Sequence, residues 1–174
     1  MKSMKQRAAA IEAIVFDVDG VLTRGDIIYS SAGTELKIFN VQDGHGFLLA
    51  HRGGLKTGIL TARASEPVRR RAKELNVTAF LEGKTDKGAG LRELAKRLRV
   101  KLSDVCYVGD DLVDLPAMRQ AGLPVAVANA VQDVKDRAAW VTRRSGGEGA
   151  AREVIEMILK ARGLWTSVIS QYVR

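Results

Sequence analysis

Short apolar runs alternate with longer amphipathic segments along this chain, and the alternation limits the possible fold more than any other feature. Each run has the length and composition of a β-strand, and the runs lie at 11–16, 56–60, 78–80, 104–108 and 124–127. Between and after them lie segments of helical period, at 46–52, 66–75, 87–98, 115–121 and 150–162, the last preceded by a strand-like run at 138–141. Strand and helix alternating in this way predict an α/β fold, with a Rossmann-like, mostly parallel sheet and helices on both faces.

Local start signals agree with this pattern. Ser65 is placed to cap a helix that has Pro67 in its first turn, and Asp86 is placed to cap the next helix. Residues 27–38 break the alternation directly after the first strand and predict a β-hairpin around a turn at 30–33. The apolar tail at 164–174 follows Gly163 and has no partner in the pattern, so we expect it to dock. The whole chain, 1–174, is expected to form one domain.

Composition excludes several classes of protein. With 46% hydrophobic and 28% charged residues the chain has the make-up of a soluble globular domain. Its single cysteine, Cys106, rules out an intramolecular disulfide and favours a reducing, cytoplasmic setting. Glu12 and Asp17 interrupt the apolar stretch near the start, which argues against a signal peptide, and no run approaches the length of a membrane span.

The net charge of +8 is compatible with nucleic acid, an acidic surface or a small anionic substrate. Much of the excess lies in amphipathic segments, where a solvated helix face explains it. Only 5% of the residues are aromatic and none alternate with the basic runs, so the sequence gives little support to a base-stacking surface. We expect no nucleic-acid partner.

Polar residues follow several of the expected strands at the point where each ends. Ligands of parallel α/β sheets bind beyond the carboxyl ends of the strands, so these residues are expected to share one site. They are Asp17 and Asp19 after the first strand, Thr61 and Arg63 after the second, Asp110 and Asp111 after a later one, and Lys87 at a helix start.

This set of side chains suits phosphoryl transfer. Several carboxylates brought together repel one another unless a hard divalent cation lies between them, and Mg²⁺ takes oxygen ligands while leaving room for a phosphate oxygen. A lysine and a hydroxyl group then share the remaining phosphate charge, and a carboxylate is available as a nucleophile. We therefore expect a Mg²⁺-dependent site.

FDVDGVLT (16–23), LTAR (60–63), TDKG (85–88) and YVGDDLVD (107–114), in this order, resemble the four motifs of the haloacid dehalogenase superfamily of phosphatases. The resemblance implies that Asp17 is the nucleophile and Asp19 the general acid and base. It also implies that Thr61 holds the phosphoryl oxygens and that Lys87 orients nucleophile and phosphate. The implied Mg²⁺ ligands are Asp17, the backbone carbonyl of Asp19, and Asp110. Asp111 and Asp114 are implied to hold these ligands in place without binding the metal themselves.

The chain has no room for the cap domain that superfamily members usually carry. Only residues 20–60 lie between Asp19 and Thr61, and only residues 62–86 between Thr61 and Lys87. The capless form, with residues 11–163, resembles the family of 3-deoxy-D-manno-octulosonate 8-phosphate (KDO 8-phosphate) phosphatases. The resemblance implies KDO 8-phosphate as substrate and a homotetramer in which the hairpins build a shared barrel. It also implies a place in lipopolysaccharide precursor synthesis.

The same resemblance implies a set of substrate-binding residues: Asn40, Val41, Gln42, Asp43, Gly44, Arg63, Arg71 and Lys87. Arginines suit a substrate that carries both a carboxylate and a phosphate. Two residues depart from the family pattern: Ala62 replaces a usual glycine, and Gln42 stands where an arginine is common. The departure at Gln42 keeps open a nine-carbon keto-sugar acid 9-phosphate as substrate, whereas Arg63 favours KDO 8-phosphate.

Two further classes of function stay open at this point. A catalytically inactive relative would use its basic surface to bind a partner, but it would have no need to keep the nucleophile, acid, threonine, lysine and metal-binding aspartate together. A regulatory module fused behind a sugar-nucleotide synthetase is the other class. Because the chain begins at the phosphatase motifs, we expect a free-standing enzyme.

Overall fold

A computed structural model describes residues 3–173 and confirms the parallel α/β architecture. All strand pairs of the main sheet are parallel, and the strand order is β5-β4-β1-β6-β7-β8. The strands are β1 (Ala13–Phe16), β4 (Lys56–Leu60), β5 (Ala79–Leu81), β6 (Val105–Gly109), β7 (Leu123–Ala126) and β8 (Trp140–Val141). The chain runs from β1 outward to β4 and β5 on one side and then to β6 on the other, so the direction of winding changes beside β1.

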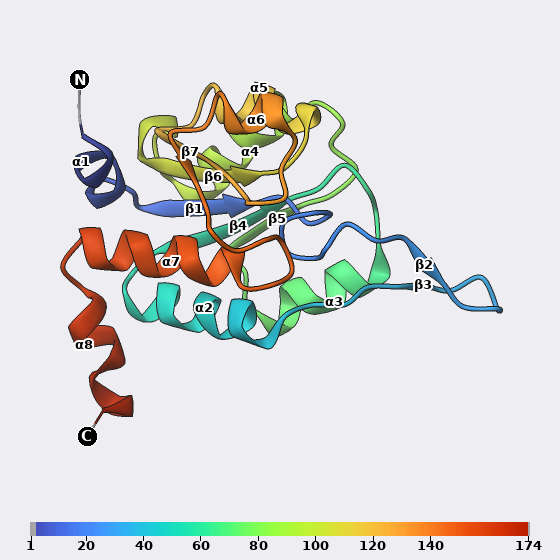
Figure 1. The fold of residues 1–174 in the computed structure, drawn as a ribbon, viewed down its shortest axis with the longest axis horizontal. Helices are drawn as coiled ribbons and strands as arrows, with labels where there is room; N and C mark the ends of the chain where they lie inside the picture. The colour runs from blue at the N-terminus through green and yellow to red at the C-terminus, as the bar shows by residue number, and fades with distance from the viewer. Residues whose placement is uncertain (1–2, 174) are drawn as a thin grey trace.

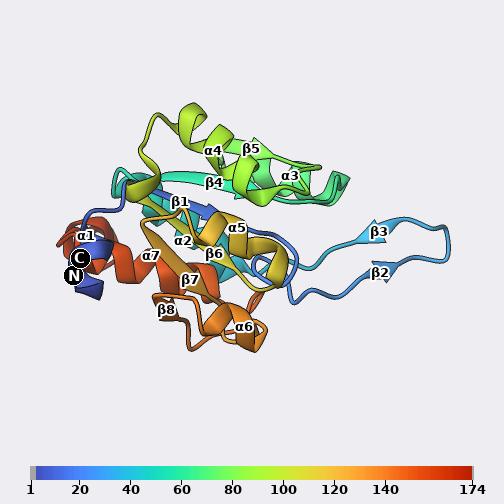
Figure 2. The same ribbon diagram turned by 90° about the horizontal axis from the view of Figure 1, so that it is seen from above.

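Helices cover both faces of the sheet (Figures 1 and 2). One face carries α2 (Val41–Arg52), α3 (Glu66–Glu74) and α7 (Ala150–Ala161), while α1 (Met4–Ala9) lies beside the start of β1 and contacts α7. The other face carries α4 (Lys87–Leu98), α5 (Leu115–Met118) and α6 (Gln132–Lys135). Single 3₁₀ turns lie at Leu102–Asp104 and Leu112–Asp114. Each face of the sheet is therefore shielded from water.

Burial on both faces explains why the central strands are uninterrupted apolar runs. All four residues of β1 are fully buried, and the ring of Phe16 lies 5.1 Å from the ring of Phe47 on α2. In β6 every residue is buried, including Tyr107 and Cys106. A two-sided core of this kind holds the strand ends, and the loops that leave them, in fixed positions.

The start of two helices differs from the sequence-based expectation. The Asp86 carboxylate accepts a hydrogen bond from the Ala89 amide at 2.9 Å, which confirms the expected cap of α4. Ser65 precedes α3 but makes no side-chain capping bond; its hydroxyl group donates to Glu35 instead, at 2.7 Å. The helix expected from residue 46 begins at Val41, because Asn40 caps it. The pattern missed α1, α6 and the helix at Trp165–Ile169, which are all short.

Strands β2 (Ile28–Tyr29) and β3 (Glu35–Leu36) form an antiparallel hairpin that projects from the body of the molecule (Figures 1 and 2). Between Asp19 and Thr61 the chain forms only this hairpin and α2, and between Thr61 and Lys87 only α3 and β5. The hairpin exposes apolar side chains: Tyr29 is 62% and Ile38 71% accessible.

The tail forms α8 (Trp165–Ile169) and a 3₁₀ turn at Ser170–Tyr172. It docks against α7 and α2. The guanidinium of Arg152 on α7 lies 5.8 Å from the ring of Trp165, and the ring of His45 on α2 lies 5.5 Å from that of Tyr172. Arg174, the last residue of the expected tail, and residues 1–2 of the expected domain lie outside the described residues. Within residues 3–173, no helix has the length and apolar character needed to cross a membrane.

Candidate active site

The three central strands end side by side and deliver polar side chains to one edge of the sheet. Phe16, at the end of β1, is in register with Ile59 of β4 and Val108 of β6. The residues that directly follow these strands are Asp17, Thr61 and Asp110. The structure therefore brings the three loops together as the sequence predicted.

A close approach at Gly20 joins the loop after β1 to the loop after β6. Gly20 has a positive φ of 81°, and a Cβ atom built on it would lie only 1.9 Å from an oxygen of Asp110. No other residue fits both the left-handed backbone and this contact. The Asp110 carboxylate consequently lies against the backbone that carries Asp17 and Asp19.

Lys87 lies between two carboxylates at the start of α4. Its Nζ atom is 2.6 Å from Asp17 Oδ2 and 2.9 Å from Asp114 Oδ1, and its side chain is only 1% accessible. Burial alone would lower the pKa of this ammonium, but the charges and hydrogen bonds of the two carboxylates outweigh it, so the pKa is raised. Lys87 is therefore a buried cation that points at the first motif.

Asp114 is fully buried and accepts hydrogen bonds at both of its oxygens. Its Oδ1 atom accepts from Lys87 and, at 2.7 Å, from the Tyr107 hydroxyl group. Its Oδ2 atom accepts from the amides of Asp110 at 2.9 Å and Asp111 at 3.3 Å. Asp114 therefore ties the lysine to the loop after β6.

Negative charge exceeds positive charge inside this cluster. Oxygens of Asp17, Asp110 and Asp114 lie within 4.8 Å of one another, and among residues 3–173 Lys87 is the cation that pairs with them. Burial, followed by the charge of Asp114, raises the pKa of Asp17 to about 7 although Lys87 opposes the rise. Burial and the same neighbouring carboxylates raise the pKa of Asp110 to about 8. Ionising these buried, neighbouring carboxylates therefore costs free energy, and a bound cation would offset that cost.

The donor set fits a hard divalent cation. Both oxygens of Asp114 are already engaged, whereas the Asp110 side chain accepts no hydrogen bond within residues 3–173. Each oxygen of Asp17 has one partner, the Val18 amide or Lys87, against two partners at each oxygen of Asp114. Asp110 and Asp17 therefore have the most capacity left to offer oxygen to a metal, and oxygen is the ligand that Mg²⁺ prefers. Asp114 belongs to the same cluster but serves to hold Lys87 and the loop amides.

A cavity of about 450 Å³ opens onto this cluster. Its lining contains the sequence-predicted residues Asp17, Asp19, Thr61, Arg63, Lys87, Asp110 and Asp111. It also contains Arg24 and Asn129, which sequence reasoning missed. Asn129 follows β7, so the rule of strand ends could have found it; its amide donates to the Gly20 carbonyl at 3.3 Å and accepts from the Gly146 amide at 2.7 Å.

Comparison with known proteins agrees with this geometry. Residues 63–154 match the model of the haloacid dehalogenase-like hydrolases. The 3-deoxy-D-manno-octulosonate 8-phosphate phosphatase of Yersinia pestis is 42% identical over 157 residues, which are 90% of this chain and 84% of the relative. The Escherichia coli K12 enzyme of the same name is 41% identical over the same shares of the two chains.

Solved structures give the same result. A Moraxella catarrhalis KDO 8-phosphate phosphatase, in complex with a magnesium ion, a phosphate ion and KDO, has a TM-score of 0.93 and 42% identity, with 97% of each chain covered. A cobalt-bound Haemophilus influenzae phosphatase of this name has a TM-score of 0.92 and 35% identity, covering 97% of this chain and all of that one. The chain belongs to the KDO 8-phosphate phosphatase family.

The substrate-binding stretch that the family resemblance implied, residues 40–44, does not line the 450 Å³ cavity. It forms the cap and first turn of α2 rather than a loop, with the Asn40 side chain accepting from the Gln42 amide at 2.7 Å. The buried Asp43 carboxylate accepts from the amides of Gly149 and Arg152 and so caps α7 across the interface. Arg71 also lies outside this cavity; it pairs with Glu74 and lies over the ring of Phe39.

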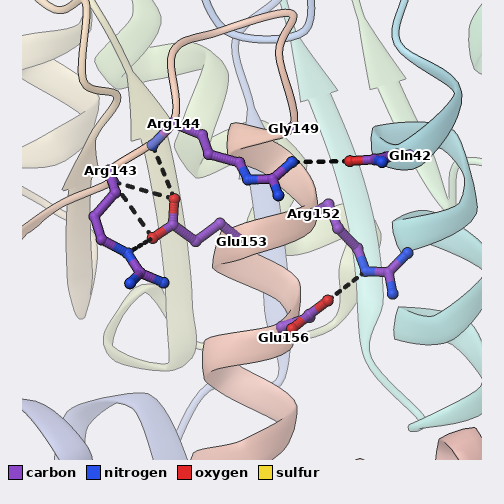
Figure 3. A pocket seen from close by; sticks show the side chains of 7 residues that line it. All are labelled: Gln42, Arg143, Arg144, Gly149, Arg152, Glu153 and Glu156. Carbon is purple, nitrogen blue, oxygen red and sulfur yellow. Dashed lines mark hydrogen bonds and ion pairs between the residues drawn. The ribbon is translucent and has the colours of Figure 1, made fainter.

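Gln42 lines a second, larger cavity of about 630 Å³ at the start of α7 (Figure 3). The arginines there are largely engaged: Arg143 pairs with Glu153, Arg152 pairs with Glu156, and Arg144 donates to the Gln42 amide oxygen at 2.8 Å. None of the aspartates that follow β1 or β6 lies in this lining. The larger of these two cavities is therefore not the site of chemistry. The charged cluster at the strand ends identifies that site in the smaller cavity.

The hairpin brings two further charged residues into contact with residues that line the active-site cavity. Lys37 pairs with Asp19, and Glu35 pairs with Arg63 through Oε1 at 2.8 Å. No signal in the sequence singled out these residues, because their position depends on how the hairpin turns back toward the sheet.

Proposed function

We propose that this chain is a Mg²⁺-dependent phosphatase that hydrolyses KDO 8-phosphate to KDO and phosphate. The observation that carries the proposal is the buried Lys87 between Asp17 and Asp114, beside the free carboxylate of Asp110, at the strand ends. This is a site for phosphoryl transfer in a family whose Moraxella catarrhalis member was crystallised with magnesium, phosphate and KDO. The chemical class is that of a phosphoric monoester hydrolase.

The carboxylates of Asp17 and Asp110, with the main-chain carbonyl of Asp19, are the groups that would hold Mg²⁺. When bound, the ion neutralises these carboxylates and draws charge from a phosphate oxygen. Asp111, which caps the following 3₁₀ turn through the Leu112 amide, and Asp114 hold this arrangement in place.

In the first step, an oxygen of Asp17 attacks the phosphorus atom, and the bond from phosphorus to the sugar oxygen breaks. Asp19 gives its proton to that departing oxygen, so KDO leaves as an alcohol and Asp17 carries the phosphoryl group as an acyl phosphate. The contact of Asp17 with Lys87 and with the Val18 amide at 2.7 Å fixes the attacking carboxylate before the substrate arrives.

In the second step, water attacks phosphorus, Asp19 takes a proton from the water, and the bond from Asp17 to phosphorus breaks. Phosphate leaves, and Asp19 is protonated again for the next cycle. Thr61 and Lys87 share the charge of the phosphoryl oxygens through a hydroxyl group and an ammonium. Both side chains are buried, so they are held in place before the charge develops.

Of the two arginines that the resemblance assigns to the substrate, Arg63 lines the cavity and Arg71 does not, so we assign Arg63 to the substrate. A sugar acid extends well beyond its phosphate, so Arg71 and residues 40–44 remain our candidates for contacts with its far end. Because Gln42 stands where an arginine is common in the family, that end of the substrate would meet one cation fewer. A nine-carbon keto-sugar acid 9-phosphate is therefore the alternative substrate to test.

We further propose a homotetramer that works in the cytoplasm and supplies KDO to lipopolysaccharide precursor synthesis. The exposed apolar side chains of the hairpin, Ile27, Tyr29, Leu36 and Ile38, support association between copies. Such contacts would also narrow an active-site cavity that is open in the single chain.

Phosphate release measured with Mg²⁺ tests the proposed substrate. KDO 8-phosphate is expected to give the highest kcat/KM among KDO 8-phosphate, a nine-carbon keto-sugar acid 9-phosphate and hexose phosphates. Preference for the nine-carbon ester would keep the chemistry and overturn the substrate. No release from any ester would instead support an inactive binding or regulatory module.

A further inference from the structure

Lys37 is a buried cation that the reaction described above does not use. It lies one residue beyond β3, where the projecting hairpin returns to the body, yet its side chain is only 2% accessible. Its neighbours Leu36 and Ile38 are exposed. Burying an ammonium is costly unless it is paired, so its partners must account for its position.

Those partners are two carboxylates. The Lys37 ammonium pairs with Asp19 Oδ1, and it lies 3.5 Å from Glu35 Oε1. Asp19 itself is in the cavity, as are the reacting aspartate and lysine. The hairpin therefore reaches the catalytic acid and base directly, through a side chain that is shielded from water.

Glu35 is held in turn by the loop that follows β4. Its Oε1 atom accepts from Arg63 at 2.8 Å, and its Oε2 atom accepts from the Ser65 hydroxyl group at 2.7 Å. The bond from Ser65 is the largest of the influences that lower the pKa of Glu35, with the charges of Lys37 and Arg63 adding to it. Glu35 thus anchors Lys37 to a fixed part of the fold.

We infer that Lys37 is a positioning residue that fixes the carboxyl group of Asp19, with Glu35 as its anchor. This inference rests on the proposed function and adds a residue to it. Asp19 must face the departing sugar oxygen in the first step and the attacking water in the second. Lys37 contacts Oδ1 of Asp19, a residue that lines the cavity, and so leaves Oδ2 for the proton transfers of both steps.

The nature of the leaving group makes this role measurable. The alkoxide of a sugar is a poor leaving group, so the departure of KDO depends on proton donation by Asp19. The p-nitrophenolate ion is stable enough to leave without a proton. Loss of Lys37 should therefore slow the transfer of a phosphoryl group from KDO 8-phosphate far more than from p-nitrophenyl phosphate. A change that merely loosened the fold would slow both.

The test is the first-turnover release of KDO and of p-nitrophenol with enzyme in excess over ester and Mg²⁺ present. For Lys37→Met we expect the KDO 8-phosphate rate to fall about 10- to 100-fold and the p-nitrophenyl phosphate rate to change less than about threefold. Glu35→Gln removes only the anchor and is expected to show the same selectivity with a smaller loss. It also keeps the test valid if Lys37→Met does not fold.

Lys96→Met makes the same chemical change at an exposed position near the end of α4, and it should alter neither rate. Equal losses for the two esters, or no loss for either, in folded Lys37→Met and Glu35→Gln would overturn the inference. If the unmodified enzyme released no KDO from KDO 8-phosphate, the proposed function would fail first and the inference with it. The two failures are therefore distinguishable.

Discussion

At the scale of single residues, Asp114 shows how a side chain outside the cavity lining can organise those within it. It is fully buried, and it connects Lys87 of α4, Tyr107 of β6 and the amides of Asp110 and Asp111. Loss of the carboxylate would remove this acceptor from the Tyr107 hydroxyl group and from the two amides, and it would leave Lys87 with Asp17 as its partner. Buried donors without acceptors are expensive, so Asp114 should affect stability as well as rate.

Replacing Asp114 with Asn tests this role. The amide group offers one acceptor oxygen and places two N–H groups against existing donors, so we expect the free energy of unfolding to fall by about 3 kcal/mol. The rate should fall by at least about tenfold because Lys87 and Asp110 both lose their support. Urea denaturation and phosphate release measure the two effects.

Asp111→Asn is the matched control, since Asp111 is exposed and its carboxylate caps one amide. We expect it to cost less than about 1 kcal/mol. If the two variants were equally stable, Asp114 would not hold the site together as described.

At the scale of elements, the hairpin links the surface of the molecule to its chemistry. The hairpin projects from the body of the molecule, and its strands and base carry exposed apolar side chains, while Glu35 and Lys37 reach Arg63 and Asp19. An exposed two-stranded hairpin is marginally stable by itself. Contact with other copies of the chain would therefore order both its tip and the charged pair at its base.

Ile38→Glu tests the association of hairpins. A charge at this position, which is 71% accessible in the single chain, would be buried without a partner in a hairpin interface. We expect light scattering to give a tetrameric mass for the unmodified protein and a smaller mass for the variant. Val131→Glu places the same charge at an exposed position beside α6, on the body of the molecule, and should keep the tetramer. A monomeric unmodified protein would contradict the proposed assembly.

The sequence predicted those elements whose pattern is set by burial in the main sheet. The apolar runs of β1, β4 and β6 and the amphipathic period of α3, α4 and α7 follow from packing on a two-sided sheet, and so does the meeting of Asp17, Thr61 and Asp110. The early start of α2 was missed because Asn40 and Asp43 make their bonds locally and to α7, respectively. Lys37 was missed because only the three-dimensional path of the hairpin brings it to Asp19.

At the scale of the whole molecule, the carboxylate cluster links stability to pH and to metal. Burial raises the pKa of Asp17 to about 7 and that of Asp110 to about 8, both from an ordinary value of 3.8. At pH values between 3.8 and these raised pKa values, the folded metal-free protein keeps protons on Asp17 and Asp110 that the unfolded chain has lost. The free energy of unfolding of the metal-free protein should therefore decrease as pH rises from about 4 to about 8.

Mg²⁺ should reverse this trend because it binds the ionised carboxylates and releases their protons. We expect Mg²⁺ to raise Tm at both pH values, and the increase should be about 2–4 °C larger at pH 8 than at pH 5.5. Thermal denaturation with and without the ion measures the difference, and Asp110→Asn should abolish the shift. An equal or larger shift at pH 5.5 would show that these carboxylates are not the metal ligands.

The assignment of Asp17 as nucleophile is tested most directly by finding the phosphoryl group on the enzyme during turnover. Acid quenching of the enzyme with KDO 8-phosphate and Mg²⁺, followed by mass spectrometry, should yield a phosphorylated peptide modified at Asp17. Asp17→Asn should yield none and should release no phosphate. Turnover of KDO 8-phosphate by Asp17→Asn, or phosphorylation at another residue, would contradict the assignment of Asp17 as nucleophile and with it the mechanism proposed for this chain.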